Sequence, residues 1–177
     1  MSRVWAMPGS NGDTFQCLPI GEFVERHLAK CEVVVDPFAR NCKLGTITND
    51  MNPDTLAEYH MDVLEFLKML VANKVQADAI IFDPPYSPRQ IKELYGGIGK
   101  KMTREDGWRT ASWKEEKVLC QTLLNLGGVF LYFGWNSQGI THPGYAIREI
   151  LLVCHGATHS DTICMAQYKM MQQLALF

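Results

Sequence analysis

Three short runs in the first half of this chain, each with apolar residues, end at the acidic residues Asp36, Asp50 and Asp83. Short apolar runs bounded by turn residues are typical of buried strands. In an open α/β sheet the carboxyl ends of parallel strands meet at one edge, and ligands bind in the crevice beyond that edge. The pattern therefore predicts an α/β fold whose ligand site is built from these three strand ends.

The second half of the chain reads as a helix, a strand and a hairpin. Residues 112–125 have helical spacing, with Leu119, Leu123 and Leu126 assigned to the inner face, and Gly127-Gly128 are expected to end the helix. The strands predicted after it cover residues 129–133, 149–154 and 162–168. The last two of these strands are predicted to pair as an antiparallel hairpin.

Composition indicates one compact domain. The 177 residues suffice for a full hydrophobic core, and the net charge is −2. The six cysteines form no close pairs, and the sequence shows neither a secretory segment nor an apolar stretch long enough to span a membrane. We therefore expect a reducing, cytoplasmic setting and no membrane partner. Four residues of the last hairpin (Cys154, His155, His159 and Cys164) are irregularly spaced, so no metal site is predicted.

The most specific chemical signal is the segment Asp83-Pro84-Pro85-Tyr86. The exocyclic amine of adenine or cytosine is a poor nucleophile, because its lone pair is delocalised into the ring. Asp83 can accept one hydrogen bond from such an amine and the Pro84 carbonyl the other, which favours tetrahedral geometry at nitrogen. Tyr86 can stack on an extruded base. The alternative is that the prolines only end a strand, since proline cannot continue the ladder.

This segment resembles motif IV of the DPPY family, the amino-methyltransferases that act on DNA. From residues 4–8 onward, the chain is similar to small adenine methylases carried by phages and mobile elements. The resemblance implies a Rossmann-like S-adenosylmethionine-dependent methyltransferase fold of the α/β class, with a mixed sheet closed by an antiparallel C-terminal hairpin. It implies a single methyltransferase domain over residues 1–177, located in the bacterial cytoplasm.

The resemblance also implies which residues hold S-adenosylmethionine. Asp36 begins a stretch that resembles motif I, which wraps the methionine part of this cofactor. Asp50 falls where the family binds the ribose hydroxyls, and Asp62 matches the acid that accepts from the cofactor's adenine amine. Residues 13–20 resemble motif X, which closes over the methionine end. The implied cofactor set is Thr14, Phe15, Asp36, Pro37, Phe38, Asp50, Met51, Asp62, Val63 and Asp83.

Some members of this set also suit a purely structural role, and one stretch departs from the family. Asp62 with Glu65 is also a helix capping box, and residues 13–20 are also consistent with an ordinary loop before a docking helix at 21–30. The family usually has glycines after motif I, whereas residues 40–42 are Arg-Asn-Cys. Asn41 is the residue there that best tolerates a positive φ. The link from strand to strand is also too short for a crossover helix.

Residues 87–111 are rich in basic side chains and glycine, and two aromatic residues, Tyr95 and Trp108, offer stacking faces. We interpret this segment as a flexible basic lid that contacts phosphates and orders on the substrate. The alternative for this segment is a solvated loop with scattered charge, and the alternative for Trp135 is a core position, which is the commoner one for a Trp at a strand end. The predicted nucleic-acid contacts are Ser87, Arg89, Lys100, Lys101, Arg104, Arg109, Trp135 and Asn136.

The tail, residues 170–177, carries a separate signal. Its last residues resemble the short peptide by which bacterial replication and repair proteins dock into the sliding clamp. The residues that match are Gln173, Leu174, Leu176 and Phe177. The alternative is that this apolar terminus packs on the chain itself or on a second copy in a homodimer, since exposed apolar termini are unfavourable.

The sequence as a whole predicts an enzyme that transfers a methyl group from S-adenosylmethionine to N6 of adenine in double-stranded DNA. The choice of adenine over cytosine rests on the family resemblance alone. Two other classes remain open: an RNA N-methyltransferase, and a non-catalytic methyltransferase-like subunit that binds nucleic acid, which the altered residues 40–42 would suit.

Overall fold

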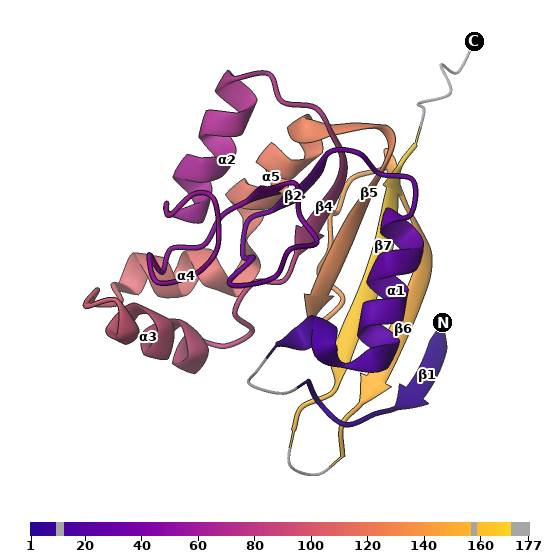
Figure 1. The fold of residues 1–177 in the computed structure, drawn as a ribbon, viewed down its shortest axis with the longest axis horizontal. Helices are drawn as coiled ribbons and strands as arrows, with labels where there is room; N and C mark the ends of the chain where they lie inside the picture. The colour runs from indigo at the N-terminus through magenta and orange to yellow at the C-terminus, as the bar shows by residue number, and fades with distance from the viewer. Residues whose placement is uncertain (10–12, 157–158, 171–177) are drawn as a thin grey trace.

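The computed structural model describes residues 1–9, 13–156 and 159–170, and its centre is a seven-stranded sheet with helices on both faces (Figure 1). The strand order is β1-β6-β7-β5-β4-β2-β3. The strands are β1 (Ser2–Trp5), β2 (Val34–Asp36), β3 (Ile47–Thr48), β4 (Ala77–Phe82), β5 (Leu124–Gly134), β6 (Tyr145–Cys154) and β7 (Thr162–Lys169). Only β7 pairs antiparallel to its neighbours, β5 and β6. The predicted mixed sheet with an antiparallel C-terminal hairpin is confirmed.

The helical segments are η2 (Thr14–Gln16), α1 (Leu18–Leu28), α2 (Val63–Ala72), α3 (Pro88–Gly97), α4 (Arg104–Ser112) and α5 (Lys114–Leu123). Helix α1 covers one face of the sheet, and α2 and α5 cover the other (Figure 1). Among the described residues, no helix is long and apolar enough to cross a membrane.

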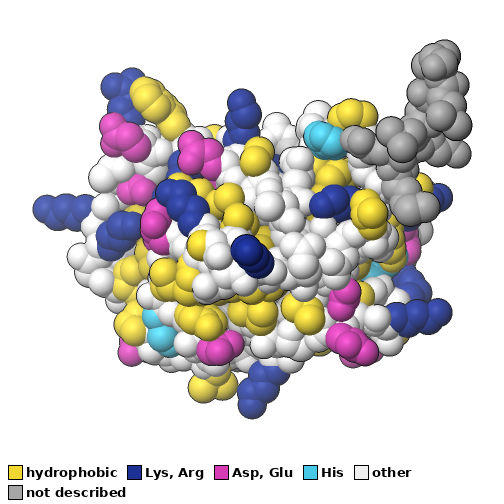
Figure 2. Space-filling model, turned by 90° about the horizontal axis from the view of Figure 1, so that it is seen from above, with side chains coloured by type: hydrophobic (Ala, Val, Ile, Leu, Met, Phe, Trp, Pro, Cys, Tyr) yellow, Lys and Arg dark blue, Asp and Glu magenta, His cyan; other side chains and the backbone are white. Residues whose placement is uncertain are grey.

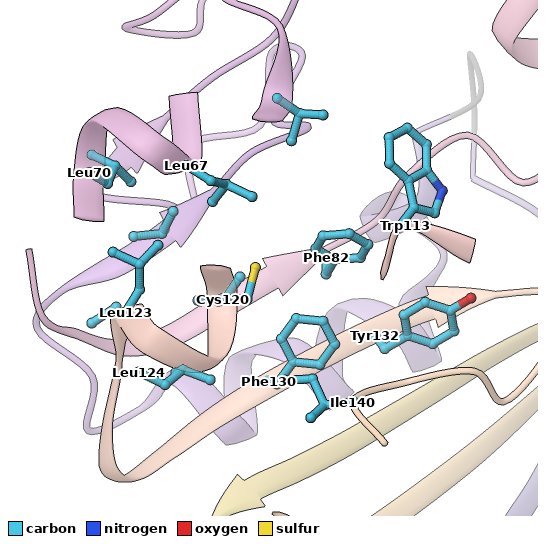
Figure 3. Packing of buried hydrophobic residues seen from close by; sticks show 14 of the residues in the cluster. Leu67, Leu70, Phe82, Trp113, Cys120, Leu123, Leu124, Phe130, Tyr132 and Ile140 are labelled. Atoms are coloured by element: carbon cyan, nitrogen blue, oxygen red, sulfur yellow. The ribbon is translucent and has the colours of Figure 1, made fainter. Parts of the chain in front are cut away.

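Side-chain alternation along β4 builds a core on each face of the sheet. Ala79 and Ile81 pack with Phe23 of α1, whereas Ile80 and Phe82 belong to the cluster on the α2 and α5 face. Figure 3 shows this second cluster, in which leucines of α2 and α5 meet aromatic side chains of β4 and β5. Each fully buried side chain of this kind contributes about 1.5–3 kcal/mol, so the alternation fixes which side chains of β4 face α1 and which face α2 and α5.

The prediction of a helix at 112–125 is wrong at both ends. The helix α4 ends at Ser112, Trp113 has a positive φ of 51°, and α5 begins at Lys114. Helix α5 then runs directly into β5 at Leu124, so Gly127-Gly128 do not end it but lie within β5, beside a register shift against β4. Leu126, assigned to the inner face, is 64% exposed.

The lid predicted as a flexible loop is helical. Capping boxes begin both of its helices: Ser87 with Gln90 in α3, and Thr103 with Asp106 in α4. Such boxes satisfy backbone donors that are otherwise unpaired at a helix start. Three glycines of this segment fall in the last turn of α3 and in the turn after it, where Gly99 has a φ of 71°, and the fourth, Gly107, lies within α4.

The short link between β2 and β3 contains no helix, as the sequence predicts, although the two strands are parallel. Strand β1, which the apolar pattern does not predict, adds a parallel edge strand to β6. Strand β7 ends at the edge opposite the carboxyl ends of β2, β4 and β5. Figure 2 shows the molecule from that edge, with positive and negative side chains interspersed over the surface.

Candidate functional site

A pocket of about 650 Å³ opens at the carboxyl edge of β2, β3 and β4. Its wall includes residues from all three strand ends, from η2 and from the α3–α4 segment. Of the predicted cofactor residues, it is lined by Thr14, Pro37, Phe38, Asp50, Met51, Val63 and Asp83. The same pocket is lined by Pro84, Pro85 and Tyr86, so the structure brings the motif I and motif IV segments together, as parallel strand ends require.

Asp83 follows the last residue of β4 and faces this pocket. Its Oδ1 accepts a hydrogen bond from the hydroxyl of Tyr86. Burial raises the pKa of Asp83 to about 6, although hydrogen bonds from Tyr86 and Thr14 and the charge of Arg40 lower it. The carboxyl group is therefore mostly ionised at neutral pH, and remains an acceptor on the pocket wall.

The side chain of Tyr86 is held at its hydroxyl and at its ring. Its hydroxyl donates to Asp83, and its ring meets Trp135 edge to face, with centroids 5.7 Å apart. The backbone N–H of Tyr86 donates to Oε1 of Gln90 at 2.6 Å, which ties the segment to the first turn of α3. The predicted stacking of a base on Tyr86 therefore requires the base to enter beside Trp135.

Asp36 does not line the pocket, unlike its neighbours Pro37 and Phe38. It is completely buried; its Oδ1 accepts from the backbone N–H of Phe38 at 3.1 Å, and its Oδ2 has no hydrogen-bond partner among the described residues. Burial, with smaller effects from Asp83 and Asp50, raises the pKa of Asp36 to about 8. Asp36 is therefore mostly protonated at neutral pH and supports the motif I loop from inside.

The loop after Asp36 reaches Asp50 through backbone hydrogen bonds. The N–H of Arg40 donates to Asp50 Oδ2 at 3.1 Å, and the N–H of Asn52 donates to Oδ1 at 2.8 Å. Arg40, not Asn41, takes the positive φ, at 51°. Asn41, which tolerates this conformation better, does not adopt it, and the arginine bears the cost of the left-handed region, about 1–2 kcal/mol.

Asp62 is both a helix cap and half of an ion pair. It caps α2 by accepting from the N–H of Leu64 at 3.0 Å, and its Oδ2 lies 2.8 Å from Nη2 of Arg109. Glu65 pairs with Lys68 instead, so the reciprocal capping box with Asp62 does not form. The carboxylate of Asp62 is not part of the pocket wall, whereas Arg109 is.

Arg109 is turned inward, contrary to the predicted phosphate contact. Besides Asp62, it lies 3.2 Å from Oε1 of Glu116, which is completely buried. Burial raises the pKa of Glu116, and the charge of Arg109 opposes that rise. These pairs tie α4 to α2 and α5, so Arg109 fixes the lid helix over the pocket.

Some of the remaining residues that were predicted to form motif X or to contact nucleic acid lie in the core, and others lie on the surface. Phe15 packs edge to face on Phe133, with centroids 5.2 Å apart, and does not line the pocket. Ser87 caps α3, and Asn136 accepts from the hydroxyl of Tyr132 at 2.9 Å. Of the basic residues predicted to contact nucleic acid, those that stay exposed on the lid are Arg89, Lys100, Lys101 and Arg104.

The exposed basic residues have neighbours of their own on the lid. Arg89 pairs with Glu93 at 2.8 Å, so part of its charge is already neutralised. Arg104 lies 4.8 Å from the centre of the Trp108 ring. The predicted clamp residues Gln173, Leu174, Leu176 and Phe177 lie outside the described residues.

Two positioning residues were not predicted from the sequence. Asn49 is 1% exposed, and its amide donates to the carbonyls of Pro37 and Met61, both at 3.2 Å. It thereby joins the motif I loop to the segment before α2. Trp113 packs against Phe38 and closes the pocket from the α4–α5 junction. The sequence signal for Asn49 was its position directly before the strand-end acid Asp50. No sequence signal pointed to the left-handed conformation of Trp113.

The residues present fit S-adenosylmethionine, the cofactor that the resemblance implies. The pocket volume lies within the range of small-molecule sites, about 300–1,000 Å³. Phe38, Met61 and Trp113 offer apolar surface for an adenine ring, and Asp50 offers carboxylate oxygens for vicinal hydroxyls. Asp83, whose carboxyl group is mostly ionised at neutral pH, adds a negative charge to the pocket wall that suits a cationic ligand.

Asp36→Asn is expected to flatten the pH dependence of stability. The folded chain keeps the Asp36 proton up to about pH 8, whereas an unfolded chain releases it above about pH 4. This group's contribution is therefore complete below about pH 4 and is lost as the pH rises toward about 8. The substituted amide keeps an acceptor for the N–H of Phe38 and carries no titrating proton.

Urea unfolding gives the free energy of unfolding at several pH values between about pH 5 and about pH 8. The contribution of Asp36 is the difference between the wild type and Asp36→Asn in the slope of this free energy against pH. The exposed residue Asp161 provides the control, as Asp161→Asn. Equal slopes for the wild type and Asp36→Asn would show that Asp36 is already ionised in the folded chain.

No protein-family model matches the chain, and neither does any curated protein. Among solved structures it is similar to TrmN from Thermus thermophilus, with 15% identity, a TM-score of 0.57, and coverage of 88% of this chain and 50% of that one. A putative SAM-dependent methyltransferase from Streptococcus mutans has 11% identity, a TM-score of 0.58, and coverage of 88% and 49%. The putative methyltransferase yhhF from Escherichia coli has 11% identity, a TM-score of 0.51, and coverage of 94% and 92%.

The chain thus spans about half the length of the first two of these structures. At these identities the likeness concerns the fold. The predicted Rossmann-like fold of S-adenosylmethionine-dependent methyltransferases is confirmed by these structures and by the strand order of the sheet.

Proposed function

We propose that this chain is an S-adenosylmethionine-dependent methyltransferase that modifies N6 of adenine in DNA. The observation that carries the proposal is the position of Asp83-Pro84-Pro85-Tyr86, which leaves β4 at the rim of the pocket next to Pro37 and Asp50. An acid and a fixed carbonyl beside a cofactor-sized pocket suit the capture of an amine. The likeness to a putative SAM-dependent methyltransferase from Streptococcus mutans supports the choice of cofactor.

The proposed chemistry asks little of the protein beyond positioning. When bound, S-adenosylmethionine supplies an electrophilic methyl group on a sulfonium. Asp83 accepts one hydrogen bond from the amine, and the Pro84 carbonyl accepts the other. These two bonds favour tetrahedral geometry at nitrogen, so that its lone pair points at the methyl group and is less delocalised into the ring. The proton leaves to water once the nitrogen carries the methyl group. Neither a covalent intermediate nor a strong base on the chain is required.

Tyr86 links substrate entry to Asp83. In the structure its hydroxyl already donates to Asp83, and a carboxylate oxygen has more than one lone pair. The amine can therefore add to Asp83 without displacing Tyr86, or can take its place. Until the amine arrives, the hydroxyl holds the carboxylate in the orientation that meets it.

Contact with the DNA backbone is proposed for the lid. Lys100, Lys101 and Arg104 are exposed on α3–α4 and its connecting turn, close to the pocket. Lysine and arginine at such a rim bind phosphates without reading sequence. Three cationic side chains give only weak binding to DNA, so a second contact that holds the enzyme at its substrate would raise the rate. The tail, residues 170–177, is the candidate for this contact.

Replacing the acid of motif IV tests the proposal. With labelled S-adenosylmethionine, the wild type is expected to label adenine N6 in duplex DNA, and Asp83→Asn to lower the rate by about 100-fold or more, as for other lost transition-state hydrogen bonds. Glu25, an exposed carboxylate on α1, gives the control variant Glu25→Gln. Duplex DNA and RNA of equal sequence are assayed side by side.

Three outcomes separate the candidate functions. Label in RNA alone would make the chain an RNA N-methyltransferase. Absence of S-adenosylmethionine binding by calorimetry would leave the non-catalytic subunit. Full activity of Asp83→Asn would show that the acid of motif IV takes no part in methyl transfer.

The rate of methyl transfer is expected to depend on pH through Asp83. Because burial raises the pKa of this carboxyl group to about 6, it is neutral and a weaker acceptor below that pH and ionised above it. The rate should therefore rise with pH through about 6 and then level off. Single-turnover rates between about pH 5 and about pH 8 measure this, and Asp83→Asn should lose the step. A wild-type rate that falls over that range would contradict the assignment.

We propose further that the tail binds the bacterial sliding clamp and raises the effective concentration of the enzyme at DNA. Strand β7 ends at the edge opposite the pocket, so a partner held there leaves the pocket open. Deletion of residues 173–177 is expected to abolish capture by immobilised clamp and to leave methylation of short duplexes unchanged. Gln172→Ala serves as the control. Retained capture after the deletion would end this part of the proposal, and a fall from dimer to monomer mass would indicate that the tail joins two copies.

A further inference from the structure

A second, smaller pocket borders the same segment of motif IV. It has a volume of about 100 Å³ and shares Pro84, Pro85, Tyr86 and Trp113 with the large pocket. Its other walls come from the start of α3, the end of α4, α5, the end of β5 and the turn after β5. One stretch of backbone therefore separates a cofactor-sized space from a smaller one.

Lys117 of α5 lies in the wall of this small pocket and is 7% exposed. Its ammonium donates to the carbonyl of Gln138 and lies 5.1 Å from the centre of the Tyr132 ring. Among the described residues, that carbonyl is the one hydrogen-bond acceptor of the ammonium, which has three protons to donate. A buried ammonium is costly unless its protons are satisfied, so the site has donors to spare for a ligand.

The other walls of the small pocket suit an aromatic ligand. Trp135 is 45% exposed at its mouth, and Tyr86 and Tyr132 line its sides. Rings of this kind stack on nucleobases, whereas a phosphate is usually held by several cationic or N–H donors. A planar heterocycle with acceptor atoms on its edge combines both features of the pocket.

We infer that the small pocket receives the methyl-accepting base and that Lys117 donates a hydrogen bond to an acceptor atom on the ring of that base. The inference rests on the proposed function and adds to it the residue that recognises the purine. Since Pro84 and Tyr86 border both pockets, a base in the small pocket lies beside the wall that carries Asp83. Lys117 is thus a binding residue, and it acts on the ring rather than on the amine.

Burial of Lys117 also affects the strength of its hydrogen bond to the base. Burial lowers the pKa of its ammonium to about 8, so the group is still mostly charged at neutral pH. A charged donor makes a stronger hydrogen bond than a neutral one. The expected contribution is about tenfold in affinity, the size of one hydrogen bond to a charged group.

Binding of single strands tests the inference without relying on catalysis. The probes are an oligothymidine strand with one central adenosine and the same strand with a central abasic site, measured by fluorescence anisotropy. The wild type is expected to prefer adenosine by about tenfold or more. Lys117→Met should lower this preference by about tenfold, chiefly by weakening the adenosine strand. Lys114→Met, an exposed lysine of the same helix, should keep the wild-type ratio.

Lys117→Gln repeats the test with a polar side chain, and urea unfolding verifies that each variant is folded. Equal wild-type affinities for the two strands, or an unchanged ratio in Lys117→Met and Lys117→Gln, would overturn the inference. The methylation assay with Asp83→Asn decides the proposed function separately, because a preference for adenosine can exist in a chain that transfers no methyl group.

Discussion

The site depends on the parallel pairing of β4 with β2 on one side and β5 on the other. This pairing brings Asp36, Asp83 and Trp135 to one edge of the sheet, although nearly a hundred residues separate the first from the last. Its register is held by apolar alternation, with Ile81 and Phe82 facing opposite cores. A slip of one residue would exchange the two faces, so the position of the acid is set by side chains that never touch a ligand.

Crowding of acids at this edge has an energetic cost that a ligand can offset. Asp36 and Asp83 are both poorly hydrated, and the charge of Asp83 opposes ionisation of Asp36. Burial, more than the charge of Asp83, keeps Asp36 protonated at neutral pH, whereas Asp83 stays mostly ionised as an acceptor on the pocket wall. A buried carboxyl group that is already neutral costs far less than a second charge. The neutral Asp36 can therefore support the motif I loop while the ionised Asp83 faces the pocket.

The sequence predicts the strand ends, the mixed sheet and the hairpin because short apolar runs and their acidic ends are local signals. Three features depend on distant partners or local competition and were missed or misread. Glycines at the end of α3 suggested a loop, but the capping boxes at Ser87 and Thr103 outweigh them. Arg109 reads as a phosphate ligand until its partner Asp62, 47 positions away, is placed beside it. Arg40 takes the left-handed conformation because its N–H meets Asp50.

The wall between the two pockets shows how such distant contacts combine. Trp113 has a φ of 51°, which costs a side chain of this size about 1–2 kcal/mol. Its ring packs against Phe38 and Phe82, with centroids 5.3 and 6.4 Å away, and this burial offsets the strain. The turn at Trp113 sets the direction of α4, and Arg109 then fixes that helix to Asp62 and Glu116. Because Trp113 lines both pockets, the packing that holds the lid also sets the distance between the space for the cofactor and the space for the base.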